Sequence, residues 1–192
     1  MGRTKRKVGQ IMLVAITGSS SGIGLAIKNE LSSDHEIVCL DITDGFNIDD
    51  ESIVDHILDA DIFINNAYSK TNPEAQQLLF EAVYEKWKYT EKQIINICSL
   101  SRYYDPKDTV KFPQYTNAKK ALNESHCNAL VEKDRKVRMT QICPGYTDTA
   151  MIDQWDVPKL QVEVISSAIH YCIKMAEQGI EIADFTICKA KA

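Results

Sequence analysis

The sequence predicts one α/β domain built on a doubly wound parallel sheet of about seven strands, with helices on both faces. Three observations lead to this fold class. Short apolar runs typical of buried strands alternate along the chain with stretches of helical periodicity. A loop with three glycines joins the first such strand to the first helix. The 192 residues, 44% of them hydrophobic, suffice for one core and would be cramped in two.

The predicted elements follow one another in the alternating order that such a sheet requires. Strands are predicted at 13–16, 36–41, 46–49, 61–67, 93–99, 137–143 and 180–188, and helices at 23–31, 50–59, 73–88, 115–130 and 158–178. Asn72 is expected to cap the helix at 73–88, with Pro73 in its first turn. Residues 12–192 are expected to form the domain, and residues 1–11, which are rich in Lys and Arg, a disordered leader.

The composition argues against several classes of protein. A net charge of −5 and a pI near 5.4 disfavour a nucleic-acid surface, and no apolar run approaches the ~20 residues that span a bilayer. The start of the chain lacks the apolar segment and cleavage site of a secretory signal. The six cysteines form no Cys-x-x-Cys pair and are expected to be reduced core residues, so a cytoplasmic location is predicted. The four histidines show no metal-ligand spacing, and no metal is predicted.

The glycine-rich loop is the most informative segment. The chain is expected to turn sharply at Gly18 and to approach a ligand at Gly22, and a side chain at Gly24 would push the helix away from the strand. The ligand is expected to be anionic, because the free N–H groups and positive dipole end of the helix point at the loop. The spacing Gly-x-x-x-Gly-x-Gly on its own is also compatible with an ordinary tight turn.

The segment Thr17-Gly18-x-x-x-Gly22-Ile23-Gly24 resembles the cofactor loop of the short-chain dehydrogenase/reductase family. Further blocks resemble motifs of that family and follow in its order: Asn65-Asn66-Ala67, Asn96-x-x-Ser99, Tyr115-x-x-x-Lys119 and Pro144-Gly145-x-x-x-Thr149. The resemblance covers nearly the whole chain from Met12. It implies a Rossmann-type fold, hydride transfer between NAD(P) and an alcohol or carbonyl compound, and a homodimer or homotetramer in which the helices from Pro73 and Tyr115 pair.

The catalytic pair of the family, Tyr-x-x-x-Lys, occurs three times, as Tyr84/Lys88, Tyr103/Lys107 and Tyr115/Lys119. Both residues must lie on one helix face, and Pro106 disfavours a helix through the second pair. The first pair precedes the strand that carries the serine, whereas the third opens the helix that follows it. We therefore predict Tyr115 as general acid/base, Lys119 as the cation that lowers its pKa, and Ser99 as the hydrogen-bonding partner of the substrate oxygen.

The resemblance also implies a supporting catalytic asparagine, for which Asn72 is the candidate, although a helix cap explains this residue equally well. Ser101 is the second candidate for the serine, because the gap from Ser99 to Tyr115 is slightly longer than the family's spacing. Tyr68 stands where the family has a glycine. A short segment at 150–157 stands where the family has a substrate lid, so the site is expected to be open.

Asp41 ends the second predicted strand 17 residues after Gly24, close to where Rossmann-type sites place the carboxylate that binds the adenosine ribose. A carboxylate repels a 2′-phosphate, and the neighbours Ile42 and Ser21 carry no positive charge, so NAD is favoured over NADP. The residues expected to contact the cofactor are Gly18, Ser20, Ser21, Gly22, Ile23, Gly24, Asp41, Asn47, Ile48, Asn66, Ala67, Tyr68, Tyr115, Lys119, Pro144, Gly145, Thr147 and Thr149.

Two classes of function follow from this reading. The first is an NAD-dependent oxidoreductase acting on an alcohol or carbonyl substrate. The second is a dinucleotide-binding sensor or interaction protein that keeps the fold and turns nothing over. The presence of Ser99, Tyr115 and Lys119 together favours the enzyme, because binding alone needs no serine.

Overall fold

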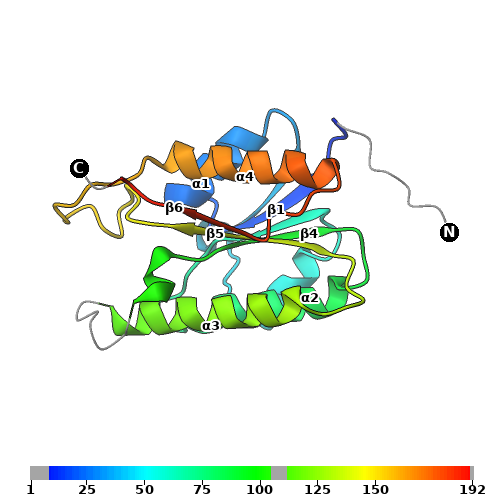
Figure 1. Cartoon of the computed structure of the whole chain (residues 1–192), viewed down its shortest axis with the longest axis horizontal. Coiled ribbons are helices and arrows are strands. Elements are labelled where there is room, and N and C mark those ends of the chain that lie inside the picture. Colours follow the sequence, from blue (N-terminus) through cyan, green and yellow to red (C-terminus); the bar gives the residue numbers. More distant parts are fainter. Residues whose placement is uncertain (1–8, 105–111, 191–192) are drawn as a thin grey trace.

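A computed structural model describes residues 9–104 and 112–190 as a sheet between two layers of helices (Figure 1). The described residues form six strands, all paired in parallel, in the order β2-β1-β3-β4-β5-β6. The strands are β1 (Leu13–Thr17), β2 (Glu36–Leu40), β3 (Ile62–Asn65), β4 (Gln93–Ile97), β5 (Arg138–Pro144) and β6 (Asp184–Ile187). The order reverses between β1 and β3, so the sheet is doubly wound, as predicted.

Helices cover both faces of this sheet (Figure 1). Helices α1 (Gly22–Leu31) and α4 (Val162–Glu177) lie together on one face, and α2 (Ala75–Trp87) and α3 (Pro113–Leu130) on the other. Short 3-10 helices are η1 (Ile42–Asp44), η2 (Glu51–His56) and η3 (Leu100–Tyr103).

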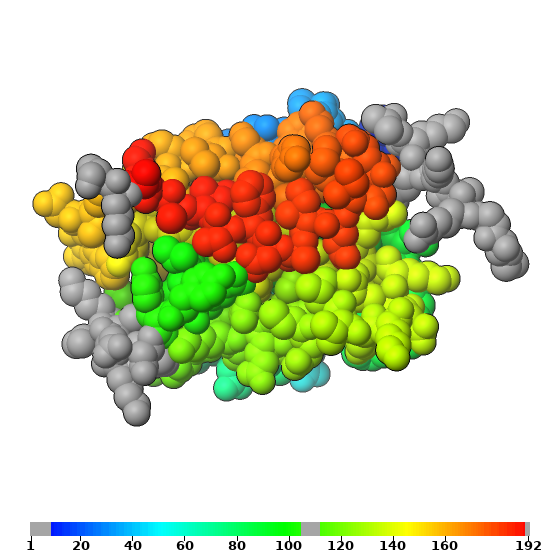
Figure 2. All heavy atoms as spheres, in the orientation of Figure 1, coloured from blue at the N-terminus to red at the C-terminus, as the bar shows by residue number. Residues whose placement is uncertain are grey.

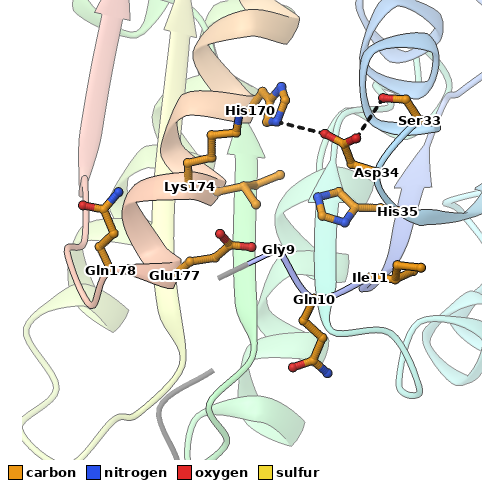
Figure 3. A pocket seen from close by; sticks show the side chains of 11 residues that line it. Gly9, Gln10, Ile11, Ser33, Asp34, His35, His170, Lys174, Glu177 and Gln178 are labelled. Carbon is orange, nitrogen blue, oxygen red and sulfur yellow. Dashed lines mark hydrogen bonds and ion pairs between the residues drawn. The ribbon is translucent and has the colours of Figure 1, made fainter. Parts of the chain in front are cut away.

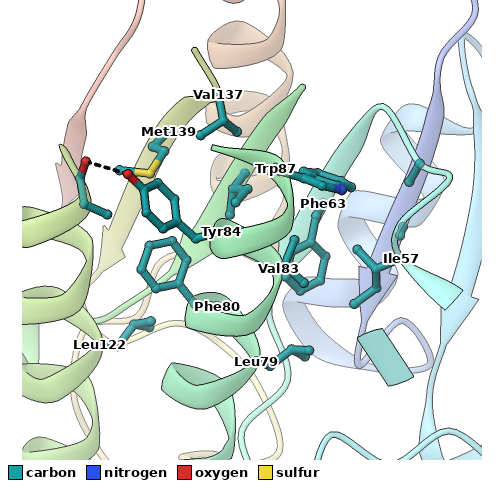
Figure 4. Close-up of a cluster of buried hydrophobic side chains, with 14 of the residues drawn as sticks. Ile57, Phe63, Leu79, Phe80, Val83, Tyr84, Trp87, Leu122, Val137 and Met139 are labelled. Atoms are coloured by element: carbon teal, nitrogen blue, oxygen red, sulfur yellow. Dashed lines mark hydrogen bonds between the residues drawn. The ribbon is translucent and has the colours of Figure 1, made fainter. Parts of the chain in front are cut away.

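Alternate residues of β1, and of other strands in the middle of the sheet, supply two separate cores. On β1, Val14 and Ile16 belong to the core under α1 and α4, whereas Ala15 belongs to the core under α2 and α3. The latter core is rich in aromatic side chains, of which Phe63, Phe80 and Trp87 are shown in Figure 4. Burial stabilises by roughly 25 cal/mol per Å² of apolar surface, so these two layers hold the strand ends in place.

The strand predicted at 46–49 is wrong, and this accounts for six strands in place of seven. The N–H of Phe46 donates to the carbonyl of Asp41 (2.9 Å), and that of Asp50 donates to the carbonyl of Asn47 (3.0 Å). The chain therefore turns back on itself after β2 and forms no further ladder. The ring of Phe46 packs against the core under α2 and α3. This turn therefore buries apolar surface although its residues form no strand.

The predicted cap of the second long helix is also wrong. Helix α2 begins at Ala75, and Glu74 occupies its cap position. The carbonyl of Asn72 instead accepts a hydrogen bond from the N–H of Ala75 (3.0 Å), which closes a turn before the helix. The N–H of Asn72 donates to Ser69 Oγ (3.1 Å). Asn72 thus belongs to a turn, and Pro73 lies outside the helix.

The cysteines are all free thiols, but they are not all core residues as expected. Cys98, Cys143 and Cys172 are buried, whereas Cys127 and Cys188 are exposed. No helix in the described part of the chain is long and apolar enough to span a membrane. Residues 1–8 of the predicted leader and Lys107 lie outside the described residues.

Candidate active site

The carboxyl ends of the parallel strands meet at one edge of the sheet, at the left of Figure 1. Most of the predicted site residues follow these strand ends and so gather at this edge. They form two groups. We call residues 17–24, which are predicted to bind a cofactor, the cofactor loop. We call the predicted catalytic residues Ser99, Tyr115 and Lys119, together with Gln76, the catalytic cluster.

The glycines of the cofactor loop adopt conformations, or allow contacts, that a side chain would prevent. Gly18 has φ +69° and Gly22 has φ +51°, in the left-handed region. A Cβ atom on Gly24 would lie 2.0 Å from the carbonyl oxygen of Gly18. Helix α1 can therefore start directly against the end of β1 only because position 24 carries no side chain.

Thr17 and Asn66 lock the cofactor loop to β3. The hydroxyl oxygen of Thr17 accepts hydrogen bonds from the N–H groups of Asn66 (2.9 Å) and Ala67 (3.1 Å). The side-chain amide of Asn66 donates in return to the carbonyls of Thr17 (2.9 Å) and Gly18 (3.2 Å). Thr17 was not among the predicted site residues. Its position beside Gly18 in the motif was the available signal.

The loop after β5 reaches the cofactor loop from the other side. A Cβ atom on Gly22 would lie 3.3 Å from Thr149 Cγ2, so these two segments are in close contact. Thr149 Oγ1 donates to the carbonyl of Thr147 (3.4 Å), and Thr147 Oγ1 donates to that of Gly145 (3.0 Å). The N–H of Gly145 donates to Ile187 O (2.7 Å), which anchors this loop to β6.

Asp41 is buried at the end of β2 and faces the cofactor loop. Its Oδ2 accepts from the N–H of Ser20 (3.1 Å), and its Oδ1 accepts from the N–H (3.0 Å) and hydroxyl (2.9 Å) of Thr43. Burial opposes ionisation, but the hydrogen bonds from Thr43 and Ser20 outweigh it and hold the pKa of Asp41 below its ordinary value. Asn47 is exposed, and its Oδ1 accepts from the N–H of Asp49 (3.0 Å) within its own turn.

Tyr115 and Lys119 lie one turn apart near the start of α3, as predicted for the third pair. Lys119 is 3% exposed, and its Nζ lies 5.3 Å from the centre of the Tyr115 ring. This Nζ donates to Gln76 Oε1 (2.6 Å) and to the carbonyl of Ile97 (2.9 Å), both of which are neutral. Burial lowers the pKa of Lys119 to about 8.

Ser99 follows β4 and faces Tyr115. Burial raises the pKa of Tyr115 to about 12, and a hydrogen bond from Ser99 partly offsets this rise. The predicted lowering of the pKa of Tyr115 is therefore wrong, because burial outweighs the hydrogen bond from Ser99. Ser99 Oγ also accepts from the N–H of Ser101 (3.1 Å). Ser101 thus holds Ser99 in place, and of the two serines Ser99 is the one that contacts Tyr115.

Gln76, and not Asn72, contacts Lys119. Gln76 is 2% exposed on the first turn of α2, and its Nε2 donates to the carbonyls of Asn65 (2.8 Å) and Ile97 (3.1 Å). These bonds aim Oε1 at Lys119. Gln76 was not predicted, since nothing in the local sequence distinguishes it from its neighbour Gln77.

Tyr68 lies beside Tyr115 and Lys119. Its ring meets that of Tyr115 edge to face, with centres 5.0 Å apart, and Lys119 Nζ lies 5.8 Å from its centre. The residue that departs from the family's motif therefore contacts Tyr115 and forms one wall of the catalytic cluster.

The other Tyr-x-x-x-Lys pairs occupy different surroundings. Tyr84 is buried between α2 and α3, where its hydroxyl donates to the carbonyl of Ala129 (3.3 Å; Figure 4). Lys88 binds Glu85 at the end of α2. Tyr103 is exposed in η3, and its partner Lys107 lies outside the described residues.

A pocket at the opposite edge of the sheet includes none of the predicted site residues (Figure 3). It is lined by residues of α4 and its C-terminal end, by the turn after α1 and by residues 9–11 before β1. There His170 lies between two carboxylates, with Nδ1 3.1 Å from Glu30 Oε1 and Nε2 3.6 Å from Asp34 Oδ2. These contacts join α4 to α1, which is a structural role.

Comparisons with known proteins bear on the fold. No family model matches the sequence. An uncharacterised oxidoreductase of Staphylococcus epidermidis is 24% identical over 225 aligned positions, which cover 90% of this chain and 93% of the relative. The 3-alpha-hydroxysteroid dehydrogenase of Pseudomonas, solved with NADH, superposes with a TM-score of 0.72 at 15% identity over 92% of this chain and 95% of the other. A short chain dehydrogenase of Burkholderia cenocepacia, solved with NADP, gives a TM-score of 0.71 at 17% identity over 94% and 90%. The resemblance is confirmed for the fold: this chain has the Rossmann-type fold of those dehydrogenases.

Proposed function

We propose that this protein is a short-chain dehydrogenase/reductase that transfers a hydride between NAD(H) and an alcohol or carbonyl substrate. The observation that carries the proposal is the buried Lys119 beside Tyr115. Burying an ammonium against neutral acceptors costs free energy that an apolar residue at the same position would avoid. A catalytic use of the charge explains why the chain retains it.

A nicotinamide dinucleotide fits the cofactor loop. A side chain at Gly22 would fill the cradle that the start of α1 forms with the loop after β5, and one at Gly24 would push α1 away from the end of β1. In this proposal Asp41 holds the adenosine ribose, Thr149 lies beside the pyrophosphate, and Lys119 binds the nicotinamide ribose. The related structures contain NADH or NADP, and the ionised Asp41 favours NAD here. When bound, the dinucleotide supplies or accepts the hydride.

The residues of the chain move the proton. With a pKa of about 12, Tyr115 is protonated at neutral pH and can donate its proton to a carbonyl oxygen as the carbonyl is reduced. Ser99 donates a hydrogen bond to the same oxygen and fixes its direction. Lys119, mostly ammonium below pH 8, stabilises the phenolate that remains, and Gln76 orients Lys119. In alcohol oxidation the same phenolate accepts the proton.

The alternative is a dinucleotide-binding sensor without turnover. Its support is Tyr68, whose ring lies against Tyr115 on the side of the catalytic cluster. A bulky residue there narrows the access of a substrate to the tyrosine hydroxyl. The sensor and the enzyme share the cofactor loop, so only turnover separates them.

The first experiment compares Tyr115→Phe with Tyr84→Phe, which removes a hydroxyl from another Tyr-x-x-x-Lys pair. NADH binding is followed by fluorescence transfer from tryptophan, and turnover with a panel of aldehydes and ketones. We expect Tyr115→Phe to bind NADH normally and to lose turnover by roughly 10²- to 10⁴-fold, the usual contribution of a general acid. Tyr84→Phe should lose only about 1 kcal/mol of stability. NADH binding with no turnover of any compound by the wild type would establish the sensor.

We further propose a homodimer or homotetramer in the cytoplasm. The outer faces of α2 and α3 are the expected contact, and Leu78 of α2 supports it because its side chain is half exposed. A monomeric mass in light scattering would contradict this assembly.

The proposed cytoplasmic location agrees with the thiols, all of which are free, as expected in a reducing compartment.

A further inference from the structure

Three aromatic side chains from separate segments meet at the carboxyl edge of the sheet. Phe112 directly precedes α3, Tyr146 follows Gly145 in the loop after β5, and Trp155 lies in the short segment before α4. The rings of Phe112 and Trp155 are stacked, with centres 5.3 Å apart and an interplanar angle of 26°. Tyr146 meets Trp155 edge to face at 5.6 Å. We call these three residues the aromatic wall.

The aromatic wall lies beside the catalytic cluster. Phe112 is one turn before Tyr115, and its carbonyl accepts from the N–H of Thr116 in the first turn of α3 (3.1 Å). Strand β5, which leads to Tyr146, pairs with β4, which leads to Ser99. Figure 2 shows the yellow-orange segment before α4 projecting at the end of the molecule where α3 begins. The segment at 150–157 is therefore held, through Trp155, against the residue that precedes α3.

The wall keeps ring surface available to a ligand. Phe112 is 46% exposed and Tyr146 is 44% exposed, although their partner Trp155 is half-buried. When an aromatic ring of a ligand packs on an accessible aromatic side chain, each ring pair contributes about 0.5–1.5 kcal/mol to binding. A planar aromatic ring can stack on the rings of Phe112 and Tyr146 more closely than a puckered aliphatic ring of equal size.

The charges around the wall favour an uncharged ligand. Three exposed aspartates surround Trp155 in the sequence, Asp148, Asp153 and Asp156, against the single Lys159, whose Nζ donates to the carbonyl of Asp153 (2.9 Å). An anionic substrate would meet repulsion on entry.

We propose that the aromatic wall is the substrate subsite and selects uncharged aryl ketones and aldehydes, together with their alcohols. This inference rests on the proposed function. In reduction, the carbonyl carbon of the aryl ketone gains a hydride from NADH as its π bond to oxygen breaks, and the oxygen takes the proton of Tyr115; the products are the aryl alcohol and NAD. The wall places the ring, and the catalytic cluster acts on the carbonyl next to it.

The test compares three ligands on the full chain: acetophenone, cyclohexyl methyl ketone, which has the same number of heavy atoms but a puckered ring, and the anion benzoylformate. Binding is measured as quenching of tryptophan fluorescence, which reports on Trp155 because Trp87 is 2% exposed. We expect half-saturation by acetophenone at a concentration about tenfold below that of cyclohexyl methyl ketone, the effect of one aromatic contact. Benzoylformate should bind more weakly than acetophenone. Trp155→Leu should abolish the quenching, and Tyr89→Leu, an exposed aromatic at the far edge, should not change it.

Turnover separates the two proposals. Trp155→Leu should lower kcat/KM for acetophenone by about tenfold and leave that for acetone unchanged. If this variant does not fold, Phe112→Leu takes its place. Quenching by acetophenone without turnover would support the subsite and overturn the proposed function. Equal half-saturation and equal kcat/KM for the planar and puckered ketones would overturn the subsite and leave the proposed function standing.

Discussion

The cofactor loop and the catalytic cluster lie at the same edge of one sheet but are held together by different forces. In the loop, backbone atoms approach so closely that a single Cβ on Gly24 would lie 2.0 Å from an oxygen. In the cluster, Lys119 is a buried cation held by two neutral acceptors. The cofactor loop therefore depends on the absence of side-chain atoms, and the catalytic cluster depends on the charge of Lys119. Substitutions that add atoms should distort the cofactor loop, and substitutions that alter only charge should change the behaviour of the catalytic cluster.

The largest expected effect is that of Gly24→Ala. Because the added Cβ meets a backbone carbonyl, α1 must move away from β1, and we expect a loss of about 1–3 kcal/mol in stability and of roughly 100-fold or more in NADH affinity. Thermal unfolding and NADH titration measure the two effects. Gly179→Ala is the control, since it has φ +80° but no atom within 4 Å of its Cβ. It should cost about 1–2 kcal/mol and leave NADH affinity unchanged. Normal NADH binding by Gly24→Ala would show that close packing at position 24 does not determine the shape of the cofactor loop.

Gln76→Glu changes charge at nearly constant volume and should move the pH profile. If Lys119 must be protonated, wild-type turnover falls as the pH rises through about 8. A carboxylate beside Nζ favours the ammonium, so the alkaline limb should shift upward by roughly 1–3 pH units. Gln77→Glu, one residue away, is the matched control and should leave the limb in place. Gln76→Met removes the acceptor and should shift the limb downward. If the alkaline limb of the pH profile is unchanged in both Gln76 variants, the protonation of Lys119 does not control turnover.

The smallest effect is expected at Asp41, where space and charge both matter. Asp41→Asn keeps one oxygen for the hydrogen bonds of Thr43 or Ser20 but removes the charge that opposes a 2′-phosphate. We expect the affinity for NADPH relative to NADH to rise by about tenfold, or roughly 1.4 kcal/mol. Asp44→Asn, on the exposed turn that follows, should leave the ratio unchanged. Fluorescence titration with both cofactors measures it, and an unaltered ratio would argue against contact with the ribose.

The sequence could predict those parts of the fold and site that depend on neighbours along the chain. Val14 and Ile16 on β1 and Ile27 and Leu31 on α1 reveal a strand and a helix through their periodicity. The glycine spacing between them predicts the close contact at Gly24. The third Tyr-x-x-x-Lys pair could be chosen because helix geometry and chain order need no tertiary information.

Other features depended on contacts between distant segments. Phe46 suits a strand by local pattern, but the core under α2 and α3 accepts its ring, and the chain turns there instead. Asn72 resembled a helix cap and a catalytic residue, yet Gln76 is the side chain that the hydrogen bonds of Asn65 and Ile97 aim at Lys119. Trp155 lies beside the start of α3 because Phe112, 43 residues earlier in the sequence, is stacked on it.

The sequence by itself determined the fold class, the tight turn through the three glycines and the position of Tyr115 and Lys119 one helical turn apart, because local periodicity and glycine sterics act between residues close in the chain. Only the tertiary structure decided how Lys119 is buried, that the pKa of Tyr115 is raised, and which side chains surround the two. Burial and hydrogen bonding depend on what distant segments bring to one place, and these set the free energy of a charge in the protein interior.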